Sequence, residues 1–129
     1  QPGQRMAMCL APLISTRGGK GILALGTPGS YGILQTQVQA MVGHVDFGLD
    51  IQAAIEMPRA RLWDGKQIYL ERRVPHSVCV ELSARGHDVA LLPDYSWRTG
   101  GMQAVSRDPD SGALAGGADS RRDGAVIPA

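Results

Sequence analysis

The residues best suited to chemistry form a glycine-rich turn at 26–32, with the sequence GTPGSYG. This turn lies between an apolar, strand-like run at 22–25 and a helical pattern that begins near Ile33. Where a strand ends in glycines and a helix begins just beyond, unpaired backbone N–H groups and the positive end of the helix dipole converge on a small volume. Such a volume favours an anion, which could be a phosphate or the oxyanion of acyl transfer.

The turn lacks the side chains of the common phosphate-binding loop. That loop needs a lysine after its second glycine, followed by a Ser or Thr that holds magnesium. Tyr31 and Gly32 stand in those places here. A tight strand-to-helix connection that binds no ligand is the competing interpretation, because a glycine-spaced turn alone is a weak pattern.

Length and composition favour a single domain over residues 1–129, with 43% hydrophobic residues for one core. Thirteen basic and twelve acidic residues leave a net charge of +1, without a dense basic run, so no nucleic acid is expected as a partner. No apolar run approaches the roughly 20 residues that span a bilayer, so no membrane is expected either. Residues 1–57 carry few charges, which indicates that this half contacts other protein.

The N-terminal residues, the cysteines and the histidines do not indicate a further functional site. The chain opens at Gln1 without a signal-peptide pattern, so we expect a piece of a longer protein, and its compartment stays open. Cys9 and Cys79 form neither a redox motif nor a zinc cluster and are expected to be buried thiols. His44 and His76 have no second ligand at helical spacing, so neither a metal nor another cofactor is expected.

Periodicity in the first half predicts a hairpin followed by helices. Apolar runs at 6–15 and 21–25, joined by a glycine turn, are typical of two strands buried on both faces. From Leu34 an apolar stripe predicts a helix that packs on a sheet and ends at Gly48. Asp50 is expected to cap a shorter helix, with Ile51, Ala54 and Ile55 on one side, that Pro58 terminates.

The second half is predicted to alternate strands, a helix and a hairpin. The pattern between 59 and 73 favours one or two strands around a turn at 64–66. Pro75 suits the first turn of a third helix that ends at Gly86 and precedes a strand at 89–92. A second hairpin pairs 102–105 with 113–115, and residues 116–129 are expected to be irregular. These elements favour an α+β or layered α/β architecture.

Five ordered segments carry a resemblance that covers nearly the whole chain. They are the turn at 26–29, the Gln-Thr-Gln at 35–37, the DFGLD-to-Pro-Arg stretch at 46–59, the Gly-His at 86–87 and the ending at 112–124. Together they resemble the C-terminal half of the gamma-glutamyltransferase (gamma-glutamyltranspeptidase) family. The ending is similar to that family's closing hairpin and Gly-x-x-Asp-Pro-Arg-Arg-x-Gly stretch, with Ser120 in place of the proline.

The resemblance implies an α+β chain that forms part of the four-layer αββα sandwich of an N-terminal-nucleophile hydrolase. In that family a precursor cleaves itself, so that a threonine becomes the N-terminus of the small subunit and attacks the acyl carbon, with its own α-amine as base. That threonine lies outside this chain. We therefore expect the C-terminal part of a small subunit, running to the natural end and inactive alone.

The same resemblance implies the partners and two sites. The partners are the remainder of the precursor and a small-molecule amide, with self-association where the missing parts leave apolar surface exposed. The oxyanion-hole glycine pair maps onto Gly29 and Ser30, whose backbone N–H groups would serve as donors. The serine pair that holds the substrate α-carboxylate maps onto Met8 and Cys9. Because methionine cannot donate and cysteine donates poorly, amide cleavage is better supported than gamma-glutamyl recognition.

Three function classes therefore remain open from the sequence. The chain could be the oxyanion-bearing segment of an acyltransferase or amidohydrolase, a binding module that holds an anion without chemistry, or a structural subunit half. Asp119, Arg121 and Arg122 likewise allow two interpretations. They could form a surface ion pair, or a buried network that anchors the terminus against the missing subunit.

Overall fold

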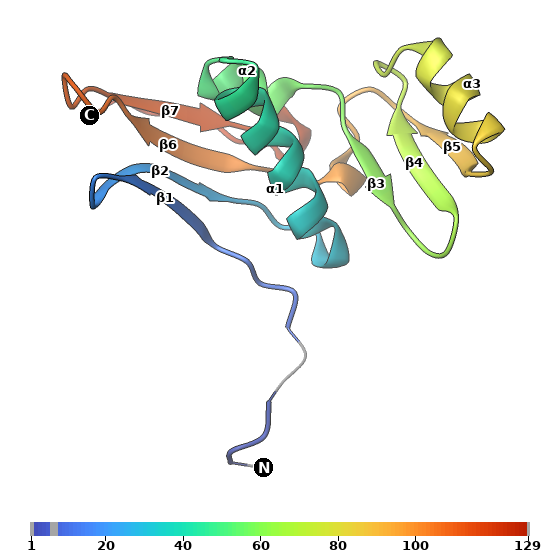
Figure 1. Ribbon diagram of the computed structural model, residues 1–129, viewed down its shortest axis with the longest axis horizontal. Coiled ribbons are helices and arrows are strands. Elements are labelled where there is room, and N and C mark those ends of the chain that lie inside the picture. The colour runs from blue at the N-terminus through green and yellow to red at the C-terminus, as the bar shows by residue number, and fades with distance from the viewer. Residues whose placement is uncertain (1, 6–7, 129) are drawn as a thin grey trace.

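Two sheets organise the part of the chain that the computed structural model describes, residues 2–5 and 8–128. The first sheet is antiparallel, in the order β1-β2-β6-β7, and consists of β1 (Leu13–Arg17), β2 (Lys20–Gly26), β6 (Gln103–Arg107) and β7 (Leu114–Ala118). The second contains β3 (Ala60–Leu62), β4 (Gln67–Glu71) and β5 (Asp88–Leu92), in which β4 and β5 run parallel. The sheets lie at opposite ends of the molecule (Figure 1).

The helices cover one face of each sheet. Helix α1 (Ile33–Met41), which a π-helical turn at Val42–Asp46 extends, and α2 (Ile51–Glu56) pack on the first sheet. Helix α3 (His76–Ala84) packs on the second sheet through Cys79. No helix in the described ranges is long and apolar enough to cross a membrane. The mixture of helices and sheets agrees with the α+β expectation.

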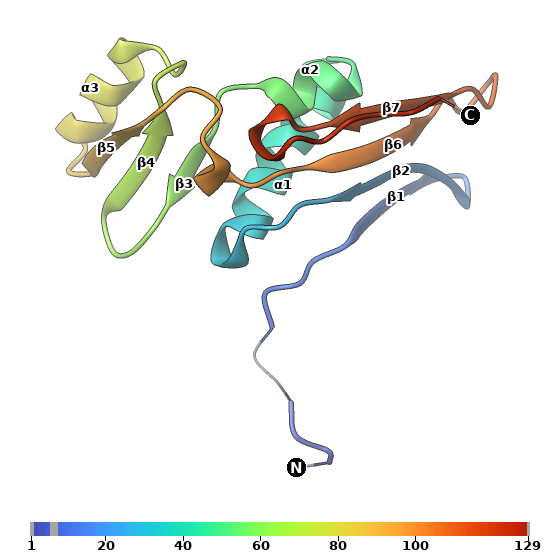
Figure 2. The same ribbon diagram turned by 180° about the vertical axis from the view of Figure 1, so that it is seen from behind.

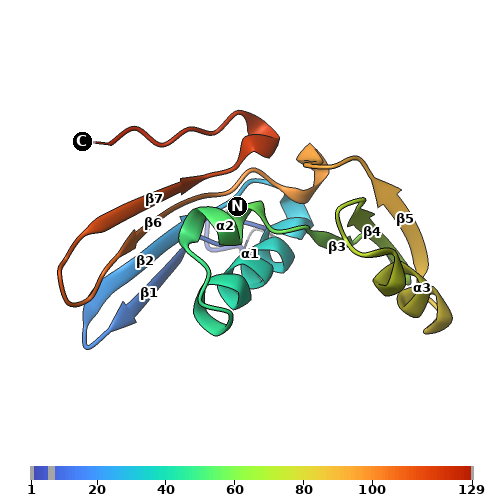
Figure 3. The same cartoon turned by 90° about the horizontal axis from the view of Figure 1, so that it is seen from above.

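The opposite face of the first sheet is largely open. Figure 3 shows α1 and α2 below this sheet and the segment after β7 along its other side, which Figure 2 shows from behind. Leu23 and Leu25 point to the helices, whereas Ile14, Ala24 and Val105 are paired across three strands on the other face and are exposed. An exposed apolar row on an antiparallel sheet is typical of a face that another layer can cover.

Local patterns gave most element positions correctly. Asp50 caps α2 by accepting a hydrogen bond from the N–H of Ala53 at 2.8 Å, and Ile51, Ala54 and Ile55 are buried as expected. The strands around 64–66, the third helix, β5 and the second hairpin also form where expected. Gly86 ends the third helix with a φ of +90°, which glycine adopts without strain.

Burial in the N-terminal half differs from the expectation. The strand expected at 6–15 begins only at Leu13, and residues 6 and 7 lie outside the described residues. β1 and β2 are not buried on both faces, because Ile14 and Ala24 are exposed. The apolar stripe of α1 also points away from the sheet: Leu34 is 63% and Val38 60% exposed.

The side of α1 that packs on the sheet is less apolar than the exposed one. Its buried residues are Ile33, Thr36, Gln37 and Ala40. Small or hydrogen-bonded side chains there let the helix approach the strands, since Thr36 donates to the carbonyl of Gly32 and Gln37 to that of Ala11. The exposed stripe agrees with the expected free apolar surface in the absence of the rest of the precursor.

The C-terminal residues are more ordered than expected. β7 continues to Ala118, and a 3₁₀ turn at Ser120–Arg122 follows it, so the expected irregular segment from 116 is wrong at its start. Gly117 explains part of this order, because a Cβ there would lie 2.8 Å from Ile55. Its lack of a side chain lets β7 pack directly on α2.

Four buried charged side chains connect the two sheets, and we call them the buried ion cluster: Arg59, Glu71, Asp119 and Arg121. Arg121 binds Glu71 through two nitrogens, at 2.6 and 2.7 Å, and contacts Asp119 at 3.1 Å. Arg59 contacts the other oxygen of Asp119 at 2.7 Å. Side-chain exposure is 1% or less for all four, so the surface-pair interpretation of Asp119 and Arg121 is wrong.

The four residues carry two positive and two negative charges, and the partly exposed Arg73 adds a further ion pair to Glu71 at 2.9 Å. Glu71 also accepts from the N–H of Arg59, the N–H of Ser96 and the hydroxyl of Thr99. Burial alone would raise the pKa of Glu71, but the hydrogen bonds and charge of Arg121 outweigh it and lower that pKa. Burial is likewise outweighed at Asp119, whose pKa is lowered by the N–H of Met102 and the charge of Arg59.

These lowered pKa values link the cluster to stability at low pH. A carboxylate with a lower pKa in the folded protein contributes stability that is complete above the unfolded-state pKa, about 4 for Asp and Glu. That contribution is lost as pH falls through the folded-state pKa. The cluster therefore stabilises the fold at neutral pH and ceases to do so in strong acid.

Replacing Glu71 by glutamine in the complete protein should lower the free energy of unfolding by about 3–5 kcal/mol, because two buried arginines are left with one carboxylate. The variant should also lose less stability than the wild type on acidification below about pH 4. Chemical denaturation across pH measures both effects.

The matched control is Glu81→Gln, which removes the exposed α3 ion pair with Arg85. We expect a change of about 0.5 kcal/mol or less there. Equal destabilisation by the two variants would contradict a structural role for the cluster.

Candidate active site

The glycine-rich turn adopts a backbone that few side chains tolerate, and we call residues 27–32 the Gly29 turn. Gly29 has a φ of +142° and a ψ of +19°, and Ser30 follows with a φ of +54°. The carbonyl of Gly29 accepts a hydrogen bond from the N–H of Gly32 at 3.0 Å, which closes a 3₁₀ turn at the start of α1. Glycine is required at the first position, whereas Ser30 adopts its conformation at an energetic cost.

The backbone N–H groups of Gly29 and Ser30 donate no hydrogen bond to the described residues. Ser30 is exposed and Gly29 partly so, and both line a cleft. Free N–H groups at the start of a helix are the usual donors to anions. The structure thus places these two predicted residues together, at a surface open to a ligand.

A second turn supports the first one, and sequence reasoning missed it. At Gly100 the φ is +106°, and a Cβ there would lie 2.5 Å from the hydroxyl of Thr27 and 3.2 Å from the carbonyl of Pro28. The Thr27 hydroxyl accepts a hydrogen bond from the N–H of Gly101 at 3.1 Å and donates to Pro28. The Gly-Gly pair at 100–101 was the available signal in the sequence.

Met8 and Cys9, the second pair of predicted site residues, lie apart from the cleft that Gly29 and Ser30 line. Met8 is 59% exposed and Cys9 is partly buried, and neither lines the cleft or hydrogen-bonds to the Gly29 turn within the described residues. Their segment is held to α1 by Gln37, whose side chain donates to the carbonyl of Ala11 at 2.7 Å. The substrate-binding role of Met8 and Cys9 therefore stays a prediction.

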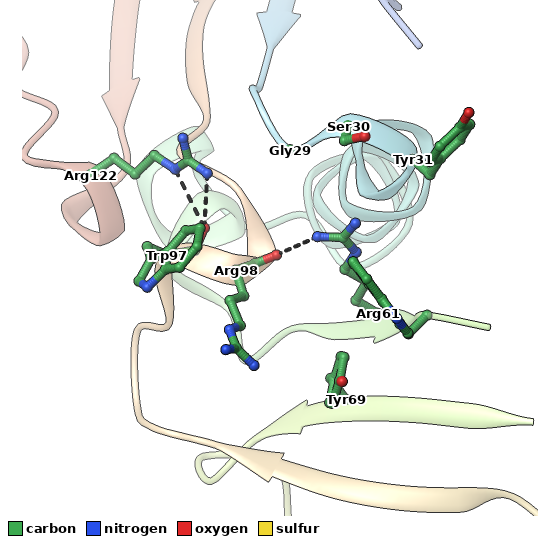
Figure 4. A pocket seen from close by; sticks show the side chains of 9 residues that line it. Gly29, Ser30, Tyr31, Arg61, Tyr69, Trp97, Arg98 and Arg122 are labelled. Carbon is green, nitrogen blue, oxygen red and sulfur yellow. Dashed lines mark hydrogen bonds between the residues drawn. The ribbon is translucent and has the colours of Figure 1, made fainter.

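The cleft has a volume of about 580 Å³ and opens between the Gly29 turn, the second sheet and the turn at Trp97–Thr99 (Figure 4). Aromatic side chains form much of its lining: Tyr31, Trp63, Tyr69 and Trp97. Three guanidinium groups complete it, from Arg61, Arg98 and Arg122, and no carboxylate of the described residues lines it. This combination suits a flat ligand with negative charge.

Arg61 is the most buried cation of the cleft, with 8% of its surface exposed. One nitrogen donates to the carbonyl of Arg98 at 2.9 Å, while Nε has no hydrogen-bond partner. Gly32 makes room for it, because a Cβ there would lie 2.8 Å from that Nε. Burial lowers the pKa of Arg61, and within the described ranges no carboxylate forms an ion pair with it.

Two of the histidines, His44 and His87, each contact a backbone carbonyl. The Nδ1 of His44 lies 2.8 Å from the carbonyl of Leu49, after the π-helical turn, and His87 lies near the carbonyl of Lys66. Among the residues with described positions, no three His, Cys, Asp or Glu side chains are grouped as metal ligands.

The comparisons with known proteins agree on one family. The model of the gamma-glutamyltranspeptidase family matches residues 1–129. Over 127 residues the chain is 38% identical to the Acylase ACY 1 proenzyme of Pseudomonas sp. (strain V22) and 32% identical to the glutathione hydrolase proenzyme of Bacillus subtilis (strain 168). Each match covers 98% of this chain, and 22% and 21% of the relatives.

Solved structures give the same result. The gamma-glutamyltranspeptidase from Pseudomonas nitroreducens complexed with L-DON superposes with a TM-score of 0.85 at 29% identity, over all of this chain and 66% of that one. A cephalosporin acylase from Bacillus halodurans superposes with a TM-score of 0.81 at 36% identity, over 87% of this chain and 21% of that one.

These matches settle the fold and the family together. The described elements are part of an N-terminal-nucleophile hydrolase sandwich, as expected from the resemblance. The chain spans about a fifth of the length of the curated relatives it matches. It belongs to the gamma-glutamyltranspeptidase family and corresponds to a small portion of that family's precursors.

Proposed function

We propose that this chain supplies the oxyanion-stabilising turn of a self-processed enzyme that cleaves or transfers an acyl group from an amide. The observation that carries the proposal is the backbone of Gly29 and Ser30, whose two N–H groups have no acceptor among the described residues and lie at the edge of a cleft. The nucleophile would be the N-terminal threonine of the family, outside these 129 residues. Catalysis then requires the remainder of the precursor as partner.

The chemistry assigns one task to this chain. As the threonine oxygen bonds to the acyl carbon, the carbonyl electron pair moves onto its oxygen, and the hydroxyl proton passes to the threonine α-amine. The N–H groups of Gly29 and Ser30 stabilise the resulting oxyanion. When the C–N bond breaks, the proton moves to the leaving amine, and water or an acceptor amine then takes the acyl group.

The acyl group itself is proposed to differ from a strict gamma-glutamyl group. Met8 and Cys9 stand where the family has the serine pair that holds the substrate α-carboxylate, and they offer at most one weak donor. Matches to proteins named acylases, besides those named glutathione hydrolases, support a wider choice of amide. A non-catalytic anion-binding or structural module is the alternative that the experiments below must exclude.

Gly29→Val in the complete, self-processed enzyme should lower kcat by about 100-fold or more, with a smaller change in KM, because the donors act on charge that develops in the transition state. Valine cannot adopt the φ of +142° without moving the neighbouring amide. Steady-state hydrolysis of gamma-glutamyl-p-nitroanilide or butyryl-p-nitroanilide, whichever the enzyme cleaves, measures both constants.

Two matched variants control this result. Gly26→Val changes a glycine of the same region that has an ordinary φ and open space around its Cβ position, and should leave kcat within a few-fold. Ser30→Gly relieves the positive φ of Ser30 and should keep or raise activity. Wild-type kcat in a correctly self-cleaved Gly29→Val enzyme would reduce the turn to a structural connection.

Cys9→Ser, alone or with Met8→Ser, should favour acyl groups that carry an α-carboxylate, because a hydroxyl donates a stronger hydrogen bond than a thiol and a thioether donates none. We expect a KM several-fold lower for gamma-glutamyl-p-nitroanilide and an unchanged KM for butyryl-p-nitroanilide, which lacks the carboxylate. An unchanged preference between these two anilides would remove the 8–9 segment from the acyl site.

A further inference from the structure

We propose that the aromatic and cationic cleft beside the Gly29 turn binds the leaving amine of the substrate, and that it selects flat amines carrying a carboxylate. The inference deepens the proposed function and rests on it, because the Gly29 turn marks the position of the scissile bond. The volume of the cleft, about 580 Å³, is in the range of small-molecule binding sites.

The charges of the cleft call for an anion. Arg61 is buried, keeps Nε without a partner and forms no ion pair in the described ranges. It lies against Gly32, the N-cap of α1, so the positive end of the helix dipole adds to its charge, and the first turn of α1 holds no acidic residue. Arg98 also forms no ion pair with a described residue. A carboxylate would neutralise this group of charges.

The walls of the cleft favour a flat ligand. The guanidinium of Arg61 lies over the ring of Trp63, 4.8 Å from its centroid, and that of Arg122 lies 5.7 Å from the ring of Trp97. Trp97 is nevertheless 62% exposed, so its ring offers open surface. Exposed aromatic surface beside cations binds conjugated rings by stacking and their carboxylates by charge.

The position of the cleft relative to α1 distinguishes the amine from the acyl group. Gln35 and Gln39, four residues apart on α1, bind the backbone of Leu62 and Ala60 on the side of the second sheet. Gln37 binds Ala11 on the other side of the helix. If the 8–9 segment contacts the acyl group, the cleft on the opposite side receives the amine.

Two free amines that differ by one carboxylate test the proposal: 5-amino-2-nitrobenzoate and 4-nitroaniline. Isothermal titration of the complete, self-processed enzyme should show about tenfold or tighter binding of the benzoate, as expected for one charge-assisted hydrogen bond. Arg61→Gln should remove most of that preference while leaving the affinity for 4-nitroaniline within about twofold. Arg98→Gln should also reduce the preference for the benzoate over 4-nitroaniline.

Arg85→Gln is the matched control, because Arg85 is exposed, pairs with Glu81 and does not line the cleft; it should leave both affinities unchanged. Equal binding of the two amines by the wild type would overturn the proposal, and this comparison needs no variant to fold. A preference that survives both Arg61→Gln and Arg98→Gln would also overturn it, by placing the anion elsewhere.

The titration separates the cleft from the catalytic proposal, because binding of a free amine needs no turnover. If the Gly29→Val enzyme keeps wild-type kcat and still prefers the benzoate, the oxyanion role is contradicted and the anion-selective cleft is supported. If Gly29→Val abolishes activity but the wild type binds both amines equally, the oxyanion role is supported and the anion-selective cleft is contradicted.

Discussion

The double hydrogen bond between Arg121 and Glu71 is the interaction on which the rest of the structure depends. It joins the 3₁₀ turn that follows β7 to the end of β4, and so connects the two sheets through a buried contact between opposite charges. Glu71 also holds Ser96 and Thr99, which fixes the turn at Trp97–Thr99. Gly100 then packs that turn against the Gly29 turn, so a contact between sheets positions the backbone of the proposed oxyanion site.

This arrangement explains why charged residues are buried in a small chain with a modest core. Isolated buried charges are costly, but here two arginines and two carboxylates share hydrogen bonds with several backbone groups. Directional contacts fix the angle between sheets in a way that apolar packing alone does not. The cleft lies at the junction of the two sheets, where such precision matters for binding (Figure 4).

Sequence patterns predicted elements well where one or two residues determine the local backbone. Asp50, Gly86 and the turn residues at 64–66 act within a few positions, and the helices and strands around them lie where expected. Burial was harder to predict, because Leu34 and Val38 look like a core-facing stripe and are exposed. Periodicity marks an apolar stripe on a helix but does not show what, if anything, packs against it.

For the candidate site too, local patterns predicted some residues and missed others. Gly29 and Ser30 were predicted as site residues because the glycine turn and the family resemblance both mark them; both have a positive φ, and their oxyanion role stays a prediction. Arg61 and Trp97 were not identified as partners, since they are 36 residues apart and meet only through the sheet junction. Gly100 was missed because its role depends on contact with Thr27, which no local pattern reveals.

The central claim is that the N–H groups of Gly29 and Ser30 hold the oxyanion of the acyl-transfer step. A crystal structure of the complete, self-processed enzyme with a boronic acid bonded to its nucleophile tests this most directly, because the tetrahedral boronate mimics the intermediate. The account predicts one boronate oxygen about 2.7–3.1 Å from both backbone nitrogens. A tetrahedral adduct whose oxygens all lie beyond hydrogen-bond distance of these two nitrogens would contradict it.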